Sequence, residues 1–124
     1  MSNLKYTTNH EWLSIEDGVA TIGITEHAQG QLGDLVFIEL PEEGRQLTAG
    51  EEAAVIESVK AAGEINAPVT GIVVEINSEL EESPDLVNQD AQGDGWFFKI
   101  RVDGDVDESG FLDQDAYNHL VADI

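Results

Sequence analysis

Residues 53–74 read AAVIESVKAAGEINAPVTGIVV, and this stretch sets the architecture that we expect for the whole 124-residue chain. Apolar and polar residues alternate along it with the period of two that half-buried β-strands show. The apolar positions of one parity are Val55, Val59, Ile65, Ala67 and Val69. Gly63 can take the positive φ that a short hairpin loop needs, so the pattern predicts two strands joined by a tight turn at residues 60–63.

Lys60 is expected at the tip of this hairpin. It is one of only five basic residues in a chain with 26 acidic ones. A hairpin would hold the lysine away from the body of the protein while its four-carbon stem stays mobile, as a swinging arm requires. We interpret Lys60 as a modification site. Charge and pattern alone leave open the alternative of an ordinary surface lysine in a turn.

The rest of the chain predicts more short strands, with helices at the periphery. The expected strands are residues 10–15, 19–24, 34–40, 71–77 and 95–102. The expected helices are one capped by Thr25 and ending by Gly33, a short one within residues 78–90, and one capped by Asp113 and running through Val121. Residues 103–110 are expected to form a polar loop. Many short strands with Gly and Pro turns favour a mainly antiparallel β sandwich or barrel.

Length and composition narrow the function further. Residues 1–124 are expected to form a single domain, and nothing in the sequence demands a second one. A formal net charge of −21 disfavours binding to nucleic acid or to an anionic membrane surface. The chain has no cysteine, no apolar run long enough to span a membrane, and no signal-peptide core. We therefore expect a cytoplasmic bacterial protein, with a processed organelle form as the alternative.

No catalytic or metal-binding motif is visible. His10, His27 and His119 lie far apart without metal-ligand spacing, so we expect each to be an ordinary surface or hydrogen-bonded residue. Asp103, Asp105 and Asp107 resemble the start of a calcium-binding loop, but Glu108 stands where that loop requires glycine and Gln114 where it requires glutamate; these substitutions indicate a solvated loop. There is also no phosphate-binding glycine loop and no nucleophile elbow.

The hairpin carries a family resemblance. The run Glu57-Ser58-Val59-Lys60-Ala61, followed by Ala67-Pro68-Val69 and Gly71, resembles the lipoyl-lysine hairpin of the glycine cleavage system H-proteins. Further segments agree with that family in order and spacing: His10-Glu11-Trp12, Gly23-Ile24-Thr25, Ala28-Gln29, Leu32-Gly33-Asp34, Glu39-Leu40-Pro41, Asn77 to Leu80, Pro84 to Asn88 and Gly95-Trp96. The resemblance implies a barrel-sandwich hybrid with short peripheral helices and a C-terminal helix.

The resemblance also implies a function without a catalytic site. Lys60 would carry lipoic acid covalently as N6-lipoyllysine, and the chain would be a carrier rather than an enzyme. It would take the aminomethyl group from a pyridoxal-phosphate glycine decarboxylase to a tetrahydrofolate-dependent aminomethyltransferase. It would then present dihydrolipoamide to a dihydrolipoamide dehydrogenase. Lipoyl-attaching enzymes would be further partners.

Two sets of residues around the arm follow from the resemblance. Glu57, which has the parity of the apolar positions, and Gly71, expected in the opposite strand, would be read by the lipoyl-attaching enzyme; a hydrogen-bonded strand acid is the other interpretation of Glu57. An aminomethyl group loses ammonia to water, so a sheltering cleft with a carboxylate for its ammonium end would help the carrier. The candidates for this cleft are Glu11 and Glu64, with Gln31 as a neutral contact; the alternative for either acid is a solvated surface carboxylate.

Two rival functional classes stay open at this point. One is a lipoyl carrier that serves another acyl-transfer system. The other is an unmodified acidic interaction module in which Lys60 is an incidental charge.

Overall fold

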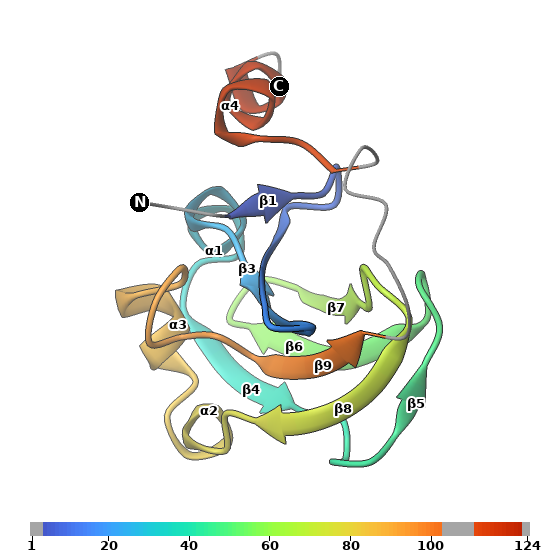
Figure 1. Ribbon diagram of the computed structural model, residues 1–124. Helices are drawn as coiled ribbons and strands as arrows, with labels where there is room; N and C mark the ends of the chain where they lie inside the picture. The colour runs from blue at the N-terminus through green and yellow to red at the C-terminus, as the bar shows by residue number, and fades with distance from the viewer. Residues whose placement is uncertain (1–3, 103–110, 123–124) are drawn as a thin grey trace.

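The computed structural model describes residues 4–102 and 111–122, which are built mainly from two antiparallel sheets (Figure 1). The six-stranded sheet has the order β1-β2-β3-β9-β8-β5, and the three-stranded sheet the order β4-β6-β7. Their bounds are β1 Lys5–Tyr6, β2 Glu11–Glu16, β3 Val19–Ile24, β4 Leu35–Glu39, β5 Gln46–Leu47, β6 Glu52–Ser58, β7 Ala62–Asn66, β8 Gly71–Ile76 and β9 Phe98–Val102. The mainly antiparallel β architecture is as predicted.

In the described part of the chain, four short helices lie outside the sheets: α1 Glu26–Leu32, α2 Glu79–Glu82, α3 Asp85–Gln89 and α4 Gln114–Ala122 (Figure 1). The predicted caps are present, since the Thr25 hydroxyl accepts a hydrogen bond from the Ala28 N–H at 3.1 Å and the Asp113 carboxylate one from the Ala116 N–H at 2.8 Å. Residues 78–90 hold two helices where one was predicted. Ser83 separates them at φ −135° and ψ 70°, because the ring of Pro84 disfavours helical geometry in the residue before it.

The predicted polar loop at residues 103–110 lies outside the described residues. Within the part of the chain that the structure describes, no helix is both long and apolar enough to cross a bilayer.

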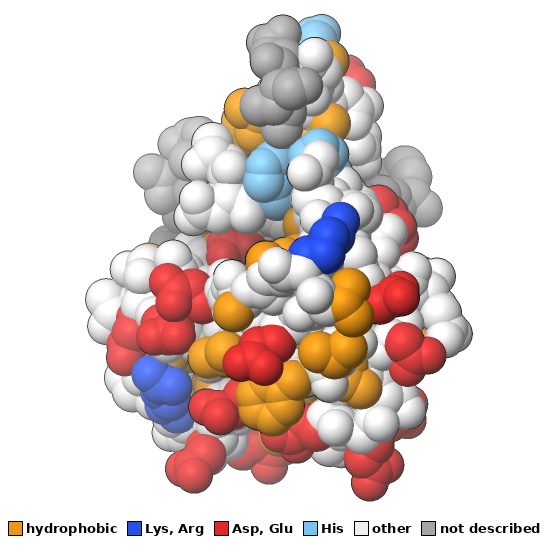
Figure 2. All heavy atoms as spheres, turned by 180° about the vertical axis from the view of Figure 1, so that it is seen from behind, with side chains coloured by type: hydrophobic (Ala, Val, Ile, Leu, Met, Phe, Trp, Pro, Cys, Tyr) orange, Lys and Arg blue, Asp and Glu red, His pale blue; other side chains and the backbone are white. Residues whose placement is uncertain are grey.

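The surface is dominated by carboxylates, as the net charge of −21 requires. Figure 2, a view from behind the orientation of Figure 1, shows acidic side chains spread over this face with few basic ones among them. Two ion pairs occur among the described residues, Arg45–Glu51 at 3.2 Å and Lys99–Glu75 at 3.8 Å. Both are at least partly exposed to solvent and contribute little to stability.

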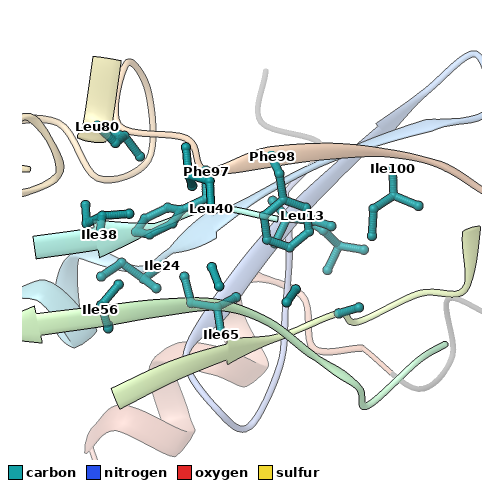
Figure 3. Packing of buried hydrophobic residues seen from close by; sticks show 14 of the residues in the cluster. Leu13, Ile24, Ile38, Leu40, Ile56, Ile65, Leu80, Phe97, Phe98 and Ile100 are labelled. Atoms are coloured by element: carbon teal, nitrogen blue, oxygen red, sulfur yellow. The ribbon is translucent and has the colours of Figure 1, made fainter. Parts of the chain in front are cut away.

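The main hydrophobic core fills the space between the two sheets (Figure 3). Leu13 and Phe98 project into it from the six-stranded sheet, and Ile56 and Ile65 from the three-stranded sheet. All four side chains are at most 4% exposed. Burying a side chain of this kind stabilises the fold by about 1.5–3 kcal/mol. The core therefore holds the lysine-bearing hairpin rigidly against the rest of the molecule.

The side of β6 that faces the core is not the one predicted. Ala54 and Ile56 are buried, whereas Val59 is 65% exposed and Glu57 also faces solvent. The prediction fails because apolar residues occupy both parities in Ala53 to Ile56, so alternation alone does not choose between them. The pairing of β6 with β4 and β7 decides which side of β6 is buried. It places Ile56 between Ile38 of β4 and Gly63 of β7, with the Ile56 side chain in the core. In β7 and just after it, the predicted set of Ile65, Ala67 and Val69 is buried.

The hairpin turn is also tighter than predicted. It comprises Val59 to Ala61, and Gly63 lies inside β7 without a positive φ. The Ser58 side chain holds the turn instead, because its hydroxyl oxygen accepts hydrogen bonds from the N–H groups of Lys60 at 3.2 Å and Ala61 at 3.0 Å. The Ser58 N–H donates to the Ala61 carbonyl at 2.7 Å. Serine is well suited to such side-chain-to-backbone turns.

A second hydrophobic cluster fastens the C-terminal helix α4 to β1 and β2. Tyr6 and Tyr117 stack with their ring centroids 4.6 Å apart, and Trp12 is buried beside them. The Trp12 indole N–H donates to the Ala91 carbonyl at 2.9 Å. This packing places Tyr117, a residue of the last helix, next to the start of β2.

Candidate functional site

Lys60 is exposed at a turn whose backbone N–H groups are hydrogen-bonded. Besides the Ser58 contacts, the Val59 N–H donates to the Asp34 carbonyl at 3.1 Å, which joins the turn to the start of β4. The Lys60 side chain passes over Gly33, because a Cβ atom on Gly33 would lie 3.0 Å from Lys60 Cε. Gly33 ends α1 at φ +78°, a conformation that glycine adopts without strain. The lysine side chain is therefore exposed on a turn that several hydrogen bonds hold in place.

A cleft of about 530 Å³ lies between α1, the start of β2 and the hairpin strands. Its apolar lining includes Ile24, Ile56 and Ile65. All three residues predicted for an arm cleft, Glu11, Gln31 and Glu64, line it together. The structure thus brings them into one hollow from three separate elements. An apolar hollow with a few polar groups is the usual form of a small-molecule site.

Glu11 is the buried carboxylate of this cleft, since the residue is only 4% exposed to solvent. Its Oε2 accepts a hydrogen bond from the Asn66 N–H at 2.9 Å, and its Oε1 one from the Thr7 hydroxyl at 3.3 Å. Burial raises the pKa of Glu11, and these two hydrogen bonds offset part of that rise. Glu11 therefore ties β2 to β7 and also offers the cleft a poorly solvated acceptor for a cation.

Gln31 and Glu64 stand at the cleft with more exposure to solvent. Glu64 lies in β7 opposite Val55, with the Glu52 carboxylate of β6 as a neighbour. The Glu64 carboxylate raises the pKa of Glu52. Glu64 is thus a more exposed carboxylate of this cleft than Glu11.

The cleft wall also contains a histidine pair that the sequence pattern did not single out. The rings of His10 and His27 lie 4.8 Å apart, and both residues line the cleft. His10 Nδ1 is 2.8 Å from the Tyr117 hydroxyl, which in turn is 2.7 Å from the Thr25 hydroxyl. Burial, and secondly the charge of His27, lower the pKa of His10, which favours the neutral ring at pH 7.

His10 and Tyr117 are 107 residues apart, so local pattern carries no signal of this contact. Within the described residues, no group of three or more His, Cys, Asp or Glu side chains could hold a metal ion.

The two residues predicted to be read during lipoylation lie in different surroundings. Glu57 is exposed on the outer face of the three-stranded sheet, opposite Phe37 of β4 and Ala62 of β7. Gly71 is buried in β8 of the other sheet, so its predicted place in the strand opposite β6 is wrong. A Cβ atom there would overlap the Arg101 carbonyl oxygen and lie 2.6 Å from Ile100 Cγ2. Glycine is needed at this position for close packing of β8 on β9.

Comparison with known proteins agrees with this geometry. Residues 4–124 match the family described as Glycine cleavage H-protein. The chain is 54% identical to the Glycine cleavage system H protein of Rhodospirillum rubrum over 125 residues, which cover 100% of this chain and 99% of that protein. It is 50% identical to the protein of the same name from Thermotoga maritima over 122 residues, which cover 98% of each.

A solved structure extends the likeness to three dimensions. The crystal structure of a glycine cleavage system H protein from Mycobacterium marinum matches this chain with a TM-score of 0.89 and 32% identity, covering 98% of both chains. The fold is accordingly the barrel-sandwich hybrid that the hairpin motif predicted. With its lysine on a hairpin tip beside a cleft, the chain belongs to the glycine cleavage H-protein family, whose members carry lipoate and are not enzymes.

Proposed function

We propose that the chain carries a lipoyl group on Lys60, as N6-lipoyllysine, and shuttles an aminomethyl group within the glycine cleavage system. It would receive this group at a pyridoxal-phosphate glycine decarboxylase and deliver it to a tetrahydrofolate-dependent aminomethyltransferase. It would then meet a dihydrolipoamide dehydrogenase. The observation that carries the proposal is the exposed Lys60 on a hydrogen-bonded turn next to an apolar cleft that contains a buried carboxylate.

The residues present fit such a group. Lys60 offers a primary amine with space around it, and the neighbouring cleft offers apolar walls for a hydrocarbon chain. When bound, the lipoyl group supplies a disulfide that accepts the aminomethyl group and is left as a dithiol to be reoxidised. The protein's own contribution is to anchor and shelter. The turn at Ser58 positions the anchor, and tethering keeps the carried group at high effective concentration near each partner.

Glu11 is the residue to which we assign retention of the ammonium end. Its Oε2 and Oε1 already have one donor each, and a carboxylate oxygen accepts more than one hydrogen bond. The apolar lining from Ile24 and Ile65 excludes water, which would otherwise release ammonia. Gln31 and Glu64 complete the polar side of the cleft in this proposal.

The remaining elements of the proposal rest on composition and family. Residues 1–124 would act as one lipoyl-carrier domain in the bacterial cytoplasm. The net charge of −21 favours partners with basic docking surfaces over nucleic acid or anionic membranes.

Mass spectrometry of the protein from its native host tests the anchor. The expected result is an added lipoyl mass confined to the peptide that contains Lys60 and absent from a Lys60→Arg variant, with Lys99→Arg as the matched control. Glycine decarboxylation with each partner omitted then tests the pathway. A bare Lys60 in cells that lipoylate other proteins would leave the acidic interaction module as the better account. A lipoylated protein that is inactive with glycine cleavage partners would favour another acyl-transfer system.

Ammonia release from the loaded protein tests the cleft. Glu11→Gln and Glu64→Gln are expected to release ammonia faster than wild type, whereas Glu57→Gln, on the outer face of the sheet, is expected to match wild type. Equal rates in all four proteins would remove Glu11 and Glu64 from the proposed retention site.

A further inference from the structure

Three large apolar side chains are exposed around the turn that carries Lys60. Val36 is 55% exposed, Phe37 45% and Val59 65%, and we call these three residues the apolar face. They belong together because β4 pairs with β6, with Phe37 opposite Glu57, and because the Val59 N–H bonds the Asp34 carbonyl. Figure 2 shows hydrophobic side chains gathered among carboxylates on the side of the three-stranded sheet.

A break in the strand pattern creates this exposure. The register between β4 and β6 shifts between Leu35 and Phe37, while Leu35 and Ile38 both point into the core. Consecutive residues Val36 and Phe37 therefore both face solvent, where a regular strand would turn one of them inward. Leaving two large apolar side chains in water is unfavourable. The largest contiguous apolar patch on a protein surface is often a functional site.

The surroundings of the apolar face indicate the nature of its partner. Three exposed acidic residues lie beside the apolar face: Asp34 just before β4, Glu39 at the end of β4 and Glu57 in β6. A matching surface is accordingly an apolar hollow with basic side chains at its rim. A second copy of this chain fits poorly, because it carries the same acidic rim and only five basic residues in all.

The position of the apolar face next to Lys60 indicates which class of enzyme binds there. An enzyme that forms a bond to Lys60 Nζ has to bring its active site onto the turn itself, and must then cover Val59 and the neighbouring start of β4. An enzyme that acts on the far end of a carried arm does not have to cover the turn, because its reacting atoms lie an arm's length from Lys60 Nζ. The apolar face lies where the first kind of enzyme makes contact.

We propose that the apolar face of Val36, Phe37 and Val59 is the docking surface for the enzyme that attaches the lipoyl group to Lys60. This inference rests on the proposed function, since it requires Lys60 to be the lipoylated residue. Docking there also brings the Lys60 amine, which acts as the nucleophile, to the active site of the enzyme. In the reaction, Nζ attacks the carbonyl carbon of an activated lipoyl donor, an acyl adenylate. The C–N bond forms as the C–O bond to AMP breaks, and the proton from nitrogen passes to a base of the enzyme.

The test measures attachment by a purified bacterial lipoate–protein ligase supplied with ATP and lipoate. Val59→Ser and Val36→Ser are expected to lower kcat/KM for lipoylation at least tenfold, mainly through KM. Ile72→Ser is the matched control, because Ile72 is 43% exposed on β8 of the other sheet, and it is expected to leave kcat/KM within twofold of wild type. Thermal melting of each variant verifies that the substitutions leave the fold intact.

Two further readouts separate the outcomes. Val59→Ser protein that has been fully lipoylated by long incubation is expected to support glycine decarboxylation at the wild-type rate. Attachment at the wild-type rate in both serine variants would overturn the docking proposal alone. Normal attachment with slow decarboxylation would assign the face to the decarboxylase instead and likewise overturn it. Absence of lipoyl transfer to wild-type protein would overturn the proposed function together with the docking site.

Discussion

Replacing Gly71 with alanine separates a packing role from a recognition role for this residue. A Cβ atom at Gly71 would overlap the Arg101 carbonyl oxygen and lie 2.6 Å from Ile100 Cγ2. Ordinary van der Waals contacts of a Cβ atom begin near 3.4 Å, so β8 and β9 have to move apart. Overpacking of this kind costs about 1–3 kcal/mol. A strained ladder hydrogen bond adds about 0.5–1.5 kcal/mol, so we expect a total loss of about 1.5–4.5 kcal/mol.

The assay has two parts, stability and lipoylation. For a chain of this length, the expected loss lowers Tm by roughly 10 °C, which thermal melting or urea unfolding will detect. Lipoylation measured well below the new Tm should proceed within twofold of wild type, because Gly71 is buried in the sheet that does not carry Lys60. Gly30→Ala is the control, since a Cβ atom there meets nothing within 4 Å and alanine should stabilise helix α1. A Gly71→Ala protein with unchanged Tm but lost lipoylation would refute this reasoning and support direct recognition.

Three other substitutions test the cleft and the turn. Glu11→Gln should gain stability relative to wild type as pH rises from the ordinary pKa of a glutamate through the raised pKa of Glu11, as measured by urea unfolding over a pH series. Burial raises the pKa of Glu11 in the native state, so the stability that its protonated form contributes is lost as pH rises through that raised pKa, and glutamine at this position has no such loss. Tyr117→Phe should cost about 1–3 kcal/mol in the same assay, because His10 Nδ1 and the buried Thr25 hydroxyl lose their shared partner; an unchanged midpoint would show that water replaces the phenol. Ser58→Ala should lower stability by about 0.5–1.5 kcal/mol and speed amide hydrogen exchange at residues 60 and 61, whose N–H groups lose their acceptor; unaltered exchange would show that the turn holds without the hydroxyl.

Glu11 has a structural role and a proposed role in binding the loaded arm. Its hydrogen bond from the Asn66 N–H fixes the edge of β7, while burial makes its charged form costly in the absence of a cation. A bound ammonium group would relieve that cost. The site proposed for the loaded arm is thus one where binding and stability are linked, so Glu11→Gln should weaken retention of the arm even where it stabilises the fold.

Local features were readable from the sequence because their causes lie within a few residues. The cap at Thr25, the end of α1 at Gly33 and the cap at Asp113 each depend on neighbouring backbone groups. The position of Lys60 in a turn between two strands is equally local. The family resemblance added the barrel-sandwich fold, and the structure places Glu11, Gln31 and Glu64 in one cleft, although their roles stay predictions.

Other features are set only by contacts between distant parts of the chain. Pairing with β4 and β7 decided which side of β6 is buried, since both sides of that strand are apolar in sequence. The packing of β8 on β9 explains why position 71 is glycine, and a helix 107 residues away completes the hydrogen bonds of His10. Sequence periodicity reports the average environment of a strand, whereas the inward face, the close approach and the buried polar contact exist only once separate elements have packed together.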